Sequence, residues 1–189
     1  MSLELHNYSK ASNGAPGVIE VRPYEPTESD VQMMGLAISA AAMAARAGDS
    51  PIGAVLIDPD KEVYVEETRE FRDGNLFGHA ELALIRRVQP KVGRDLGGCT
   101  MYSVAEPCYG CCYPIDKGGL KRLYVAALRS DVDFFTRKEP EMPSIFANSR
   151  RRLEVVSGLL LPEARKLFTS ANRRHWGDNV DEDLVKEGA

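Results

Sequence analysis

Short apolar segments alternate with segments of helical periodicity through most of this sequence, and that alternation limits the possible fold more than any other feature. Apolar runs rich in β-branched and aromatic residues predict strands at 52–57, 63–66, 99–104, 123–127 and 153–156. Apolar residues at three- and four-residue steps predict helices at 29–47, 79–88 and 162–174. Residues 109–117 form a mixed segment, and a loop with a short helix is expected within 131–150. Strands that alternate with helices in this way predict an α/β domain with three layers, α/β/α, around a five-stranded mixed sheet that opens with an antiparallel hairpin.

The length of 189 residues fits one domain, since domains usually contain about 100 to 200 residues. Residues 1–28 mix glycine and proline with polar residues and show no sustained period, which predicts an irregular N-terminal arm. The folded domain is expected at 29–176, with Ser29 or Asp30 as the cap of its first helix. Residues 177–189 are acidic, and we expect them to form a frayed tail.

Charge and cysteine content indicate the class of partner and the compartment. Lys and Arg number 24 against 28 Asp and Glu, a formal net charge of −4, whereas a dedicated nucleic-acid binder usually has a basic surplus. A nucleic acid is therefore a disfavoured partner, although the charge does not exclude it. The sequence contains no run of the roughly 20 apolar residues that a membrane span requires, and its first residues lack the layout of a signal peptide. We expect a cytoplasmic protein with no membrane partner, whose four cysteines serve a metal or catalysis and not disulfides.

Three residues supply the ligand types that zinc prefers. His79 offers an imidazole, and Cys108 and Cys111 offer two thiols in a Cys-x-x-Cys pair. At the start of a helix this spacing places the two sulfurs about one turn apart, and the positive end of the helix favours their thiolate forms. Three protein ligands leave the fourth tetrahedral position to water, as in catalytic zinc sites. The sequence therefore predicts one Zn²⁺ per chain.

Simpler interpretations of the cysteines exist. A Cys-x-x-Cys pair alone can be a redox pair or half of a structural zinc site. Cys112 could close a structural site only by leaving helical geometry, because adjacent residues on a helix project about 100° apart. We therefore expect Cys112 and Cys99 to be small buried apolar side chains without chemistry.

Glu81 is the candidate catalytic acid and base. It follows His79 by two residues, and on a regular helix that step rotates a side chain by about 200°, so the two cannot both point directly at one metal. From the first helical turn, the Glu81 carboxylate could take a proton from water at the metal and hand it to a leaving nitrogen.

These motifs resemble the signature H-x-E…P-C-x-x-C of the cytidine and deoxycytidylate deaminase-like zinc hydrolases. Here the signature reads His79-Ala80-Glu81 and Pro107-Cys108-Tyr109-Gly110-Cys111, and the resemblance covers roughly residues 30 to 174. It implies a cytidine deaminase-like fold, zinc on His79, Cys108 and Cys111, and Glu81 as the acid and base. It also implies that the backbone amides of Ala80 and Cys108 face the reacting centre.

Two departures from the family concern the substrate. Many members have an asparagine at the end of the second strand that hydrogen-bonds the base or sugar, and Thr68 stands at that place here. The segment Asn75-Leu76-Phe77-Gly78 before the histidine is bulkier than usual, which implies a reshaped pocket. In the free-base branch the last helix ends beside the site, so Trp176 is a candidate cover for the bound ring. The alternative is that this tryptophan only packs the helix end onto the domain.

Three functions follow from these observations. The resemblance is closest to the cytosine- and guanine-type branch, which implies a zinc-dependent hydrolytic deaminase of a small nucleobase, nucleoside or related amino-heterocycle that releases ammonia. The first alternative is a tRNA adenosine deaminase, which the acidic charge and the missing asparagine disfavour. The second alternative is a zinc-binding partner subunit without turnover, against which the presence of Glu81 argues. The family also implies a homodimer, to which Tyr109, Tyr113 and Ile115 would contribute.

Overall fold

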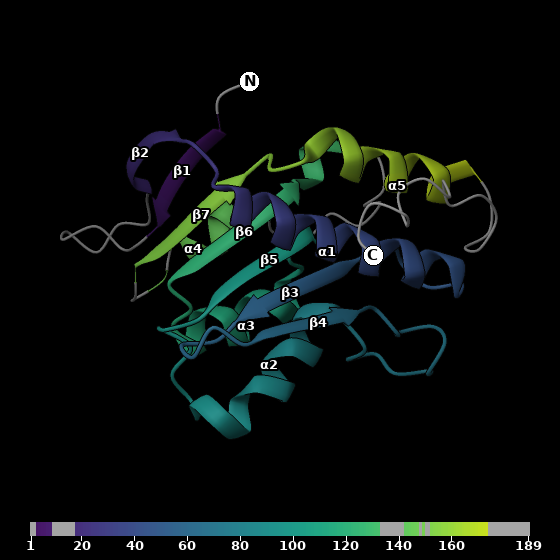
Figure 1. Cartoon of the computed structure of the whole chain (residues 1–189), viewed down its shortest axis with the longest axis horizontal. Helices are drawn as coiled ribbons and strands as arrows, with labels where there is room; N and C mark the ends of the chain where they lie inside the picture. Colours follow the sequence, from purple (N-terminus) through teal and green to yellow (C-terminus); the bar gives the residue numbers. More distant parts are fainter. Residues whose placement is uncertain (1–2, 9–17, 133–141, 148, 150–151, 174–189) are drawn as a thin grey trace.

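A seven-stranded sheet forms the centre of the computed structural model of the chain, which describes residues 3–8, 18–132, 142–147, 149 and 152–173 (Figure 1). The strands are β1 (Leu3–Tyr8), β2 (Val18–Tyr24), β3 (Gly53–Ile57), β4 (Val63–Glu67), β5 (Thr100–Ala105), β6 (Arg122–Ala127) and β7 (Leu153–Ser157). Their order across the sheet is β2-β1-β7-β6-β5-β3-β4. The helices are α1 (Glu28–Arg46), α2 (Ala80–Val92), α3 (Tyr109–Gly118), α4 (Met142–Phe146) and α5 (Leu161–Arg173), with a 3-10 turn at Arg129–Asp131.

Strands β5, β6 and β7 are parallel neighbours, and antiparallel strands flank them on both sides. β3 is antiparallel to β4 and to β5, which confirms the predicted hairpin, and β1 is antiparallel to β7 and to β2. In register, Leu123 of β6 lies between Met101 of β5 and Val155 of β7. Parallel strands share a carboxyl edge, so the segments that follow β5 and β6 both leave the sheet at one edge.

The predictions of a five-stranded sheet and of an irregular arm over residues 1–28 are wrong, because β1 and β2 add two strands at one side of the sheet. Leu5 of β1 is fully buried and pairs with Val156 of the last strand. β2 is the edge strand, a position at which a residue such as Pro23 is tolerated. β7, the strand that joins β1 to the rest of the sheet, is remote in the sequence, so no local pattern revealed that pairing.

Helices cover both faces of the sheet, which confirms the three predicted layers (Figure 1). α1 and α5 lie on one face, in a core that includes Met34 and Phe168. α2, α3 and α4 lie on the other face, in a core that includes Leu84, Ile115 and Phe146. Among the described helices, none combines the length and the apolar character that crossing a bilayer requires.

Helix α1 begins after Thr27, which corrects the predicted cap at Ser29 or Asp30. Thr27 Oγ1 accepts the N–H of Asp30, and the Asp30 carboxylate accepts the N–H of Thr27, which forms a reciprocal capping box. Farther along, α1 lies very close to β3, because a Cβ at Gly53 would stand 2.3 Å from the carbonyl oxygen of Ala37. Glycine at position 53 therefore permits the contact between this helix and the sheet.

Candidate active site

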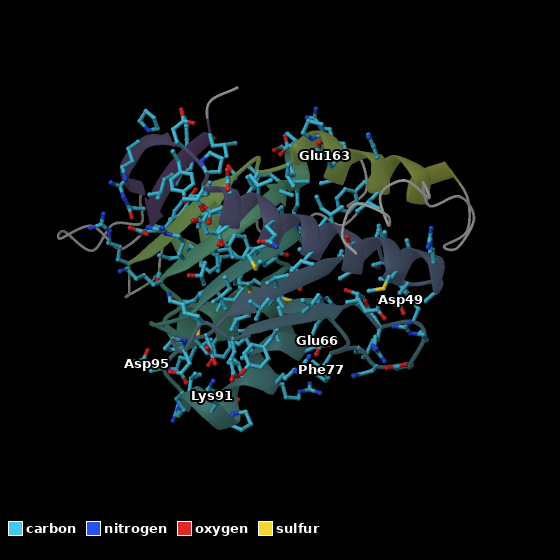
Figure 2. The ribbon with its side chains drawn as sticks, viewed as in Figure 1. Asp49, Glu66, Phe77, Lys91, Asp95 and Glu163 are labelled. Carbon is cyan, nitrogen blue, oxygen red and sulfur yellow. The ribbon has the colours of Figure 1, made fainter. Side chains whose placement is uncertain are left out.

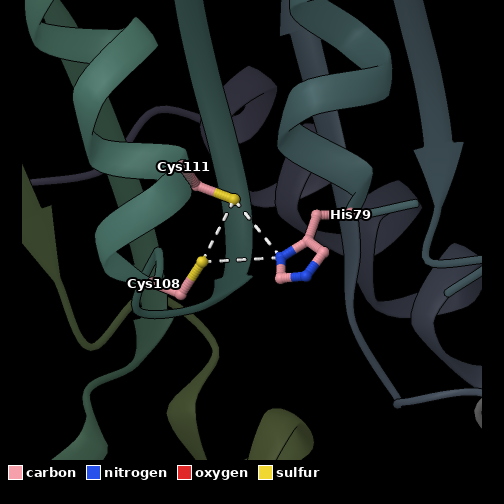
Figure 3. Close-up of side chains that lie close together, drawn as sticks. All are labelled: His79, Cys108 and Cys111. Atoms are coloured by element: carbon pink, nitrogen blue, oxygen red, sulfur yellow. Dashed lines mark hydrogen bonds between the residues drawn. The ribbon is translucent and has the colours of Figure 1, made fainter. Parts of the chain in front are cut away.

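The three predicted metal ligands meet where α2 and α3 begin (Figure 3). His79 is the N-cap residue of α2, Cys108 is the N-cap residue of α3, and Cys111 lies in the first turn of α3. His79 Nδ1 lies 3.5 Å from Cys108 Sγ and 3.4 Å from Cys111 Sγ, and the two sulfurs are 3.5 Å apart. The structure thus brings the imidazole of His79 to the two thiols, which lie 29 and 32 positions later in the sequence.

This donor set fits zinc. Ligand atoms at about 2.0 to 2.3 Å from a tetrahedral zinc ion stand roughly 3.3 to 3.8 Å from one another, and all three measured separations lie in that range. One nitrogen and two sulfurs are the borderline and soft ligands that zinc selects. Among the described residues, His79, Cys108 and Cys111 are the group of His, Cys and acidic side chains placed to share one ion. Three ligands leave one tetrahedral position open.

Cys112 and Cys99 are not part of the donor set. The Sγ of Cys112 lies 3.4 Å from the carbonyl oxygen of Pro107, and both cysteines are buried in the core under α2 and α3. The prediction that both side chains are buried is therefore confirmed. Cys112 therefore provides a natural control for experiments on its neighbour Cys111.

Hydrogen bonds within the donor set change the pKa values of its members. The hydrogen bond with Cys111, followed by the one with His79, lowers the pKa of Cys108 to about 4, so Cys108 is a thiolate at neutral pH. The hydrogen bond with Cys108 raises the pKa of His79 to about 9. The hydrogen bond with Cys108, together with burial, raises the pKa of Cys111. One thiolate is therefore already available, and metal binding displaces protons from the other two ligands.

Glu81 directs its carboxylate toward the same centre without joining the ligand set. Its Oε2 lies 3.6 Å from Cys111 Sγ, and only 3% of the residue is exposed. His79 precedes the helix and has an extended backbone with ψ of 141°, so the rotation expected on a regular helix does not describe this pair. Burial raises the pKa of Glu81. A buried carboxyl group beside an open metal position suits the transfer of protons.

Ser103 is a residue of this site that sequence reasoning missed. It lies in β5, is fully buried, and its Oγ is 3.0 Å from Glu81 Oε1. A signal was present, because alternation along β5 places Ser103 on the same face as the apolar residue Met101, which lies in the core under α2 and α3. A polar residue at such a position requires a polar partner.

Glu70 was also missed. Its Oε2 lies 3.5 Å from His79 Nε2, the ring nitrogen that points away from the two sulfurs. Glu70 belongs to the irregular segment 68–79 between β4 and α2, where no periodicity specifies the direction of a side chain. No pattern in the sequence therefore predicted the contact between Glu70 and His79.

Thr68, a predicted substrate contact, is buried just after β4. Only 2% of the residue is exposed, and its N–H donates to the carbonyl oxygen of Ile52 at 2.9 Å. Alternation along the strand places Thr68 on the face of Glu66, whose carboxylate binds Arg87 of α2. Within the described part of the chain, the hydroxyl oxygen of Thr68 is buried without a hydrogen-bond partner.

The remaining predicted contacts are two backbone amides and one side chain. Ala80 is the first residue of α2 and Cys108 caps α3, so neither N–H has an acceptor within its own helix. Both belong to the helix starts that carry the predicted metal ligands. Trp176 lies outside the described residues.

The tyrosines predicted at a subunit interface are exposed on α3. Tyr109 and Tyr113 are 60% and 67% exposed. Ile115, which was expected to join them, is fully buried in the core of its own chain. The prediction for Ile115 is therefore wrong, because this residue faces the sheet and not the outer side of α3.

Known proteins resemble this chain in amino-acid sequence. Residues 27–127 match the family described as the cytidine and deoxycytidylate deaminase zinc-binding region. A probable cytosine deaminase of Schizosaccharomyces pombe is 29% identical over 133 residues, which cover 70% of this chain and 82% of that protein. A tRNA-specific adenosine deaminase of Haemophilus influenzae is 28% identical over 165 residues, which cover 85% of this chain and 93% of that protein.

Solved structures agree with the sequence comparison. One comes from a study of A-to-I editing by tRNA:A34 deaminases at the wobble position, with 30% identity, a TM-score of 0.62, and coverage of 71% of this chain and 97% of the other. A guanine deaminase from Nitrosomonas europaea shares the fold, with a TM-score of 0.62 at 24% identity over 75% of this chain and 84% of the other. The region that matches the family contains all three predicted metal ligands and Glu81.

Proposed function

The chain belongs to the family of the cytidine and deoxycytidylate deaminase zinc-binding region, and on that basis we propose that it hydrolytically deaminates a small nucleobase, nucleoside or related amino-heterocycle and releases ammonia. The observation that carries the proposal is the position of Glu81, whose carboxylate lies 3.6 Å from a metal ligand while remaining outside the ligand set. The similarity to a probable cytosine deaminase supports a small substrate.

His79, Cys108 and Cys111 hold the zinc ion in this proposal. When bound, zinc supplies a Lewis acid that lowers the pKa of a coordinated water toward about 7. Hydrolytic deamination consumes one water, whose oxygen replaces the amino group as a ring carbonyl. One of its protons goes to the adjacent ring nitrogen, and the other must travel to the departing nitrogen. Glu81 accepts a proton at its carboxylate and delivers it to that nitrogen, and the hydrogen bond from Ser103 holds the carboxylate in place.

Thr68 is the proposed side-chain contact to the substrate. A buried hydroxyl left without a partner costs roughly 1 to 3 kcal/mol, and a ring nitrogen, carbonyl or amino group of a substrate would remove that cost. The N–H groups of Ala80 and Cys108 are proposed to bind the reacting part of the ring, since both belong to helix starts. We keep Trp176 as the proposed aromatic cover of the ring.

A tRNA adenosine deaminase is the second candidate. The 28% identity to the Haemophilus influenzae enzyme extends across 85% of this chain, and the structure from the tRNA:A34 deaminase study has 30% identity. Against it stand the net charge of −4 and the threonine at position 68. A zinc-binding partner subunit without turnover is the third candidate, and the retained Glu81 argues against it.

Two further parts of the proposal concern the assembly and its location. Tyr109 and Tyr113 expose apolar surface on one side of α3, and a second copy of the chain would cover it in a homodimer. The cytoplasmic location inferred from the sequence remains part of the proposal.

Ammonia release from the zinc-loaded protein tests the three candidates together. The panel contains free bases, nucleosides, nucleotides and a short tRNA anticodon hairpin, with Glu81→Gln as the background control. Release from a base or nucleoside supports the proposal. Release from the hairpin alone supports the tRNA candidate, and zinc binding without any release supports the partner subunit.

A further inference from the structure

The outer nitrogen of the metal ligand His79 has a carboxylate partner. His79 presents Nδ1 to the two sulfurs at 3.5 and 3.4 Å, and its other ring nitrogen, Nε2, lies 3.5 Å from Glu70 Oε2. The side chains of His79 and Glu70 are 26% and 27% exposed, so both are largely withdrawn from water. We propose that Glu70 is a positioning residue of the zinc centre, which accepts the Nε2–H of His79 and so orients the imidazole toward the ion.

The chemistry of a ligand histidine supports this role. A neutral imidazole carries one N–H and one lone pair, so a ring that gives the Nδ1 lone pair to a metal must carry its proton on Nε2. That N–H requires an acceptor, and carboxylates commonly provide it in metal sites. The nearby carboxylate of Glu81 is engaged with Ser103 and Cys111, which leaves Glu70 for the outer nitrogen.

The backbone around Glu70 is fixed by its own hydrogen bonds. The N–H of Arg69 donates to the carbonyl oxygen of Gly78 at 2.7 Å, and the carbonyl oxygen of Glu70 accepts the N–H of Asn75 at 2.9 Å. A Cβ at Gly78 would stand 2.9 Å from backbone atoms of Arg69 and Glu70. The residue before His79 therefore packs directly against the backbone that carries Glu70.

A buried carboxylate attaches this segment to α1. Asp49, labelled in Figure 2, is fully buried just after α1. Its two oxygens accept the N–H groups of Phe71 and Arg72 at 2.9 and 3.1 Å. Glu70 thus lies immediately before two anchored residues. A carboxylate on a backbone that is fixed on both sides can orient a ligand with less loss of conformational entropy on metal binding.

Glu66 provides a matched control. Its carboxylate is four positions from Glu70 and 22% exposed, and it binds Arg87 at 2.8 Å instead of His79. Glu70→Gln and Glu66→Gln remove the same charge from neighbouring places. Glu70→Ala also removes the acceptor, and Gly78→Ala leaves Glu70 intact but displaces its backbone.

Zinc affinity, measured by competition with a chelating dye on the folded full-length chain, tests the proposal. Loss of such a partner typically weakens metal affinity 10- to 100-fold, and we expect that loss for Glu70→Ala, a smaller loss for Glu70→Gln, and a loss for Gly78→Ala. The zinc affinity of Glu66→Gln should remain within about twofold of that of the parent, which is a smaller change than the loss of a carboxylate partner of the histidine causes. The visible absorption of the cobalt(II)-loaded protein should shift for Glu70→Ala and not for Glu66→Gln.

Two results would overturn the positioning role. One is a folded Glu70→Ala protein with parental zinc affinity and an unchanged cobalt spectrum. The other is an equal loss of affinity in Glu70→Ala and Glu66→Gln, which would indicate a general charge effect. The inference rests on the zinc site of the proposed deaminase but not on its substrate, since neither measurement uses one, so failure of the ammonia panel would leave it standing.

Discussion

Ser103 Oγ lies 3.0 Å from Glu81 Oε1 and 2.8 Å from the carbonyl oxygen of Ala105. A hydroxyl has one proton, so it donates to only one of these two acceptors at a time. Ser103 belongs to the sheet and Glu81 to a helix, and the hydrogen bond between them fixes the carboxylate relative to the sheet.

Replacing Ser103 by Ala should lower kcat by roughly 10- to 100-fold, because a hydrogen bond to a charged group contributes about 1.5 to 3 kcal/mol. KM and zinc content should stay close to those of the parent, since the hydroxyl touches neither the ligand sulfurs nor the imidazole. Steady-state kinetics on the identified substrate measure kcat and KM separately. Ser103→Thr keeps the hydroxyl and should restore most of kcat, and a parental kcat in Ser103→Ala would disprove the orienting role.

Glu81→Gln should retain zinc and fold while losing about 10²- to 10⁴-fold in kcat. The amide has the size of the carboxylate but cannot accept and return a proton. Kinetics and metal analysis of the same preparation provide the measurement. A Gln variant that turns over at nearly the parental rate would exclude Glu81 as the proton shuttle.

Cys111→Ala should reduce bound zinc well below one ion per chain, whereas Cys112→Ala should not, although the two residues are adjacent and both fully buried. Only Cys111 places its sulfur near Cys108 and His79, and Cys112 contacts the carbonyl oxygen of Pro107 instead. Atomic absorption on the purified proteins gives the metal content. Equal zinc loss in the two variants would contradict the ligand assignment.

Asp30 should contribute stability that is lost in acid. Burial alone would raise its pKa, but hydrogen bonds from Thr27, Tyr102 and Tyr24 outweigh burial and lower the pKa below 3.8. A depressed folded-state pKa means that the contribution is present above pH 3.8 and declines as the pH falls toward the folded-state value.

Asp30→Asn should therefore be less stable than the parent at pH 7, and the difference should shrink as the pH approaches 3. Urea unfolding of both proteins across this range measures it. A stability difference that stays constant with pH would show that the ionisation of Asp30 does not contribute.

Residue type and local spacing were enough to predict which residues come together at the candidate metal site and where most strands lie. His79, Cys108, Cys111 and the strands from 52 to 157 were predicted in this way, because ligand chemistry and hydrophobic periodicity are local properties. The pairing of β1 with β7 depends on a contact between distant segments, and no pattern within residues 3–8 specified it. Glu70 was missed for a similar reason, because loop geometry alone brings its carboxylate to His79.

The pairing of the first strand with the last has a consequence for folding on the ribosome. Leu5 pairs with Val156, so 151 further residues must be synthesised after Leu5 before β1 can join the rest of the sheet through β7. At synthesis rates of about 5 to 20 residues per second, that wait lasts roughly 8 to 30 seconds. Until then β1 and β2 can form only a two-stranded hairpin, which is marginally stable by itself. The nascent chain therefore exposes an unpaired strand edge for most of its synthesis, and completion of the sheet at β1 is a late event in folding.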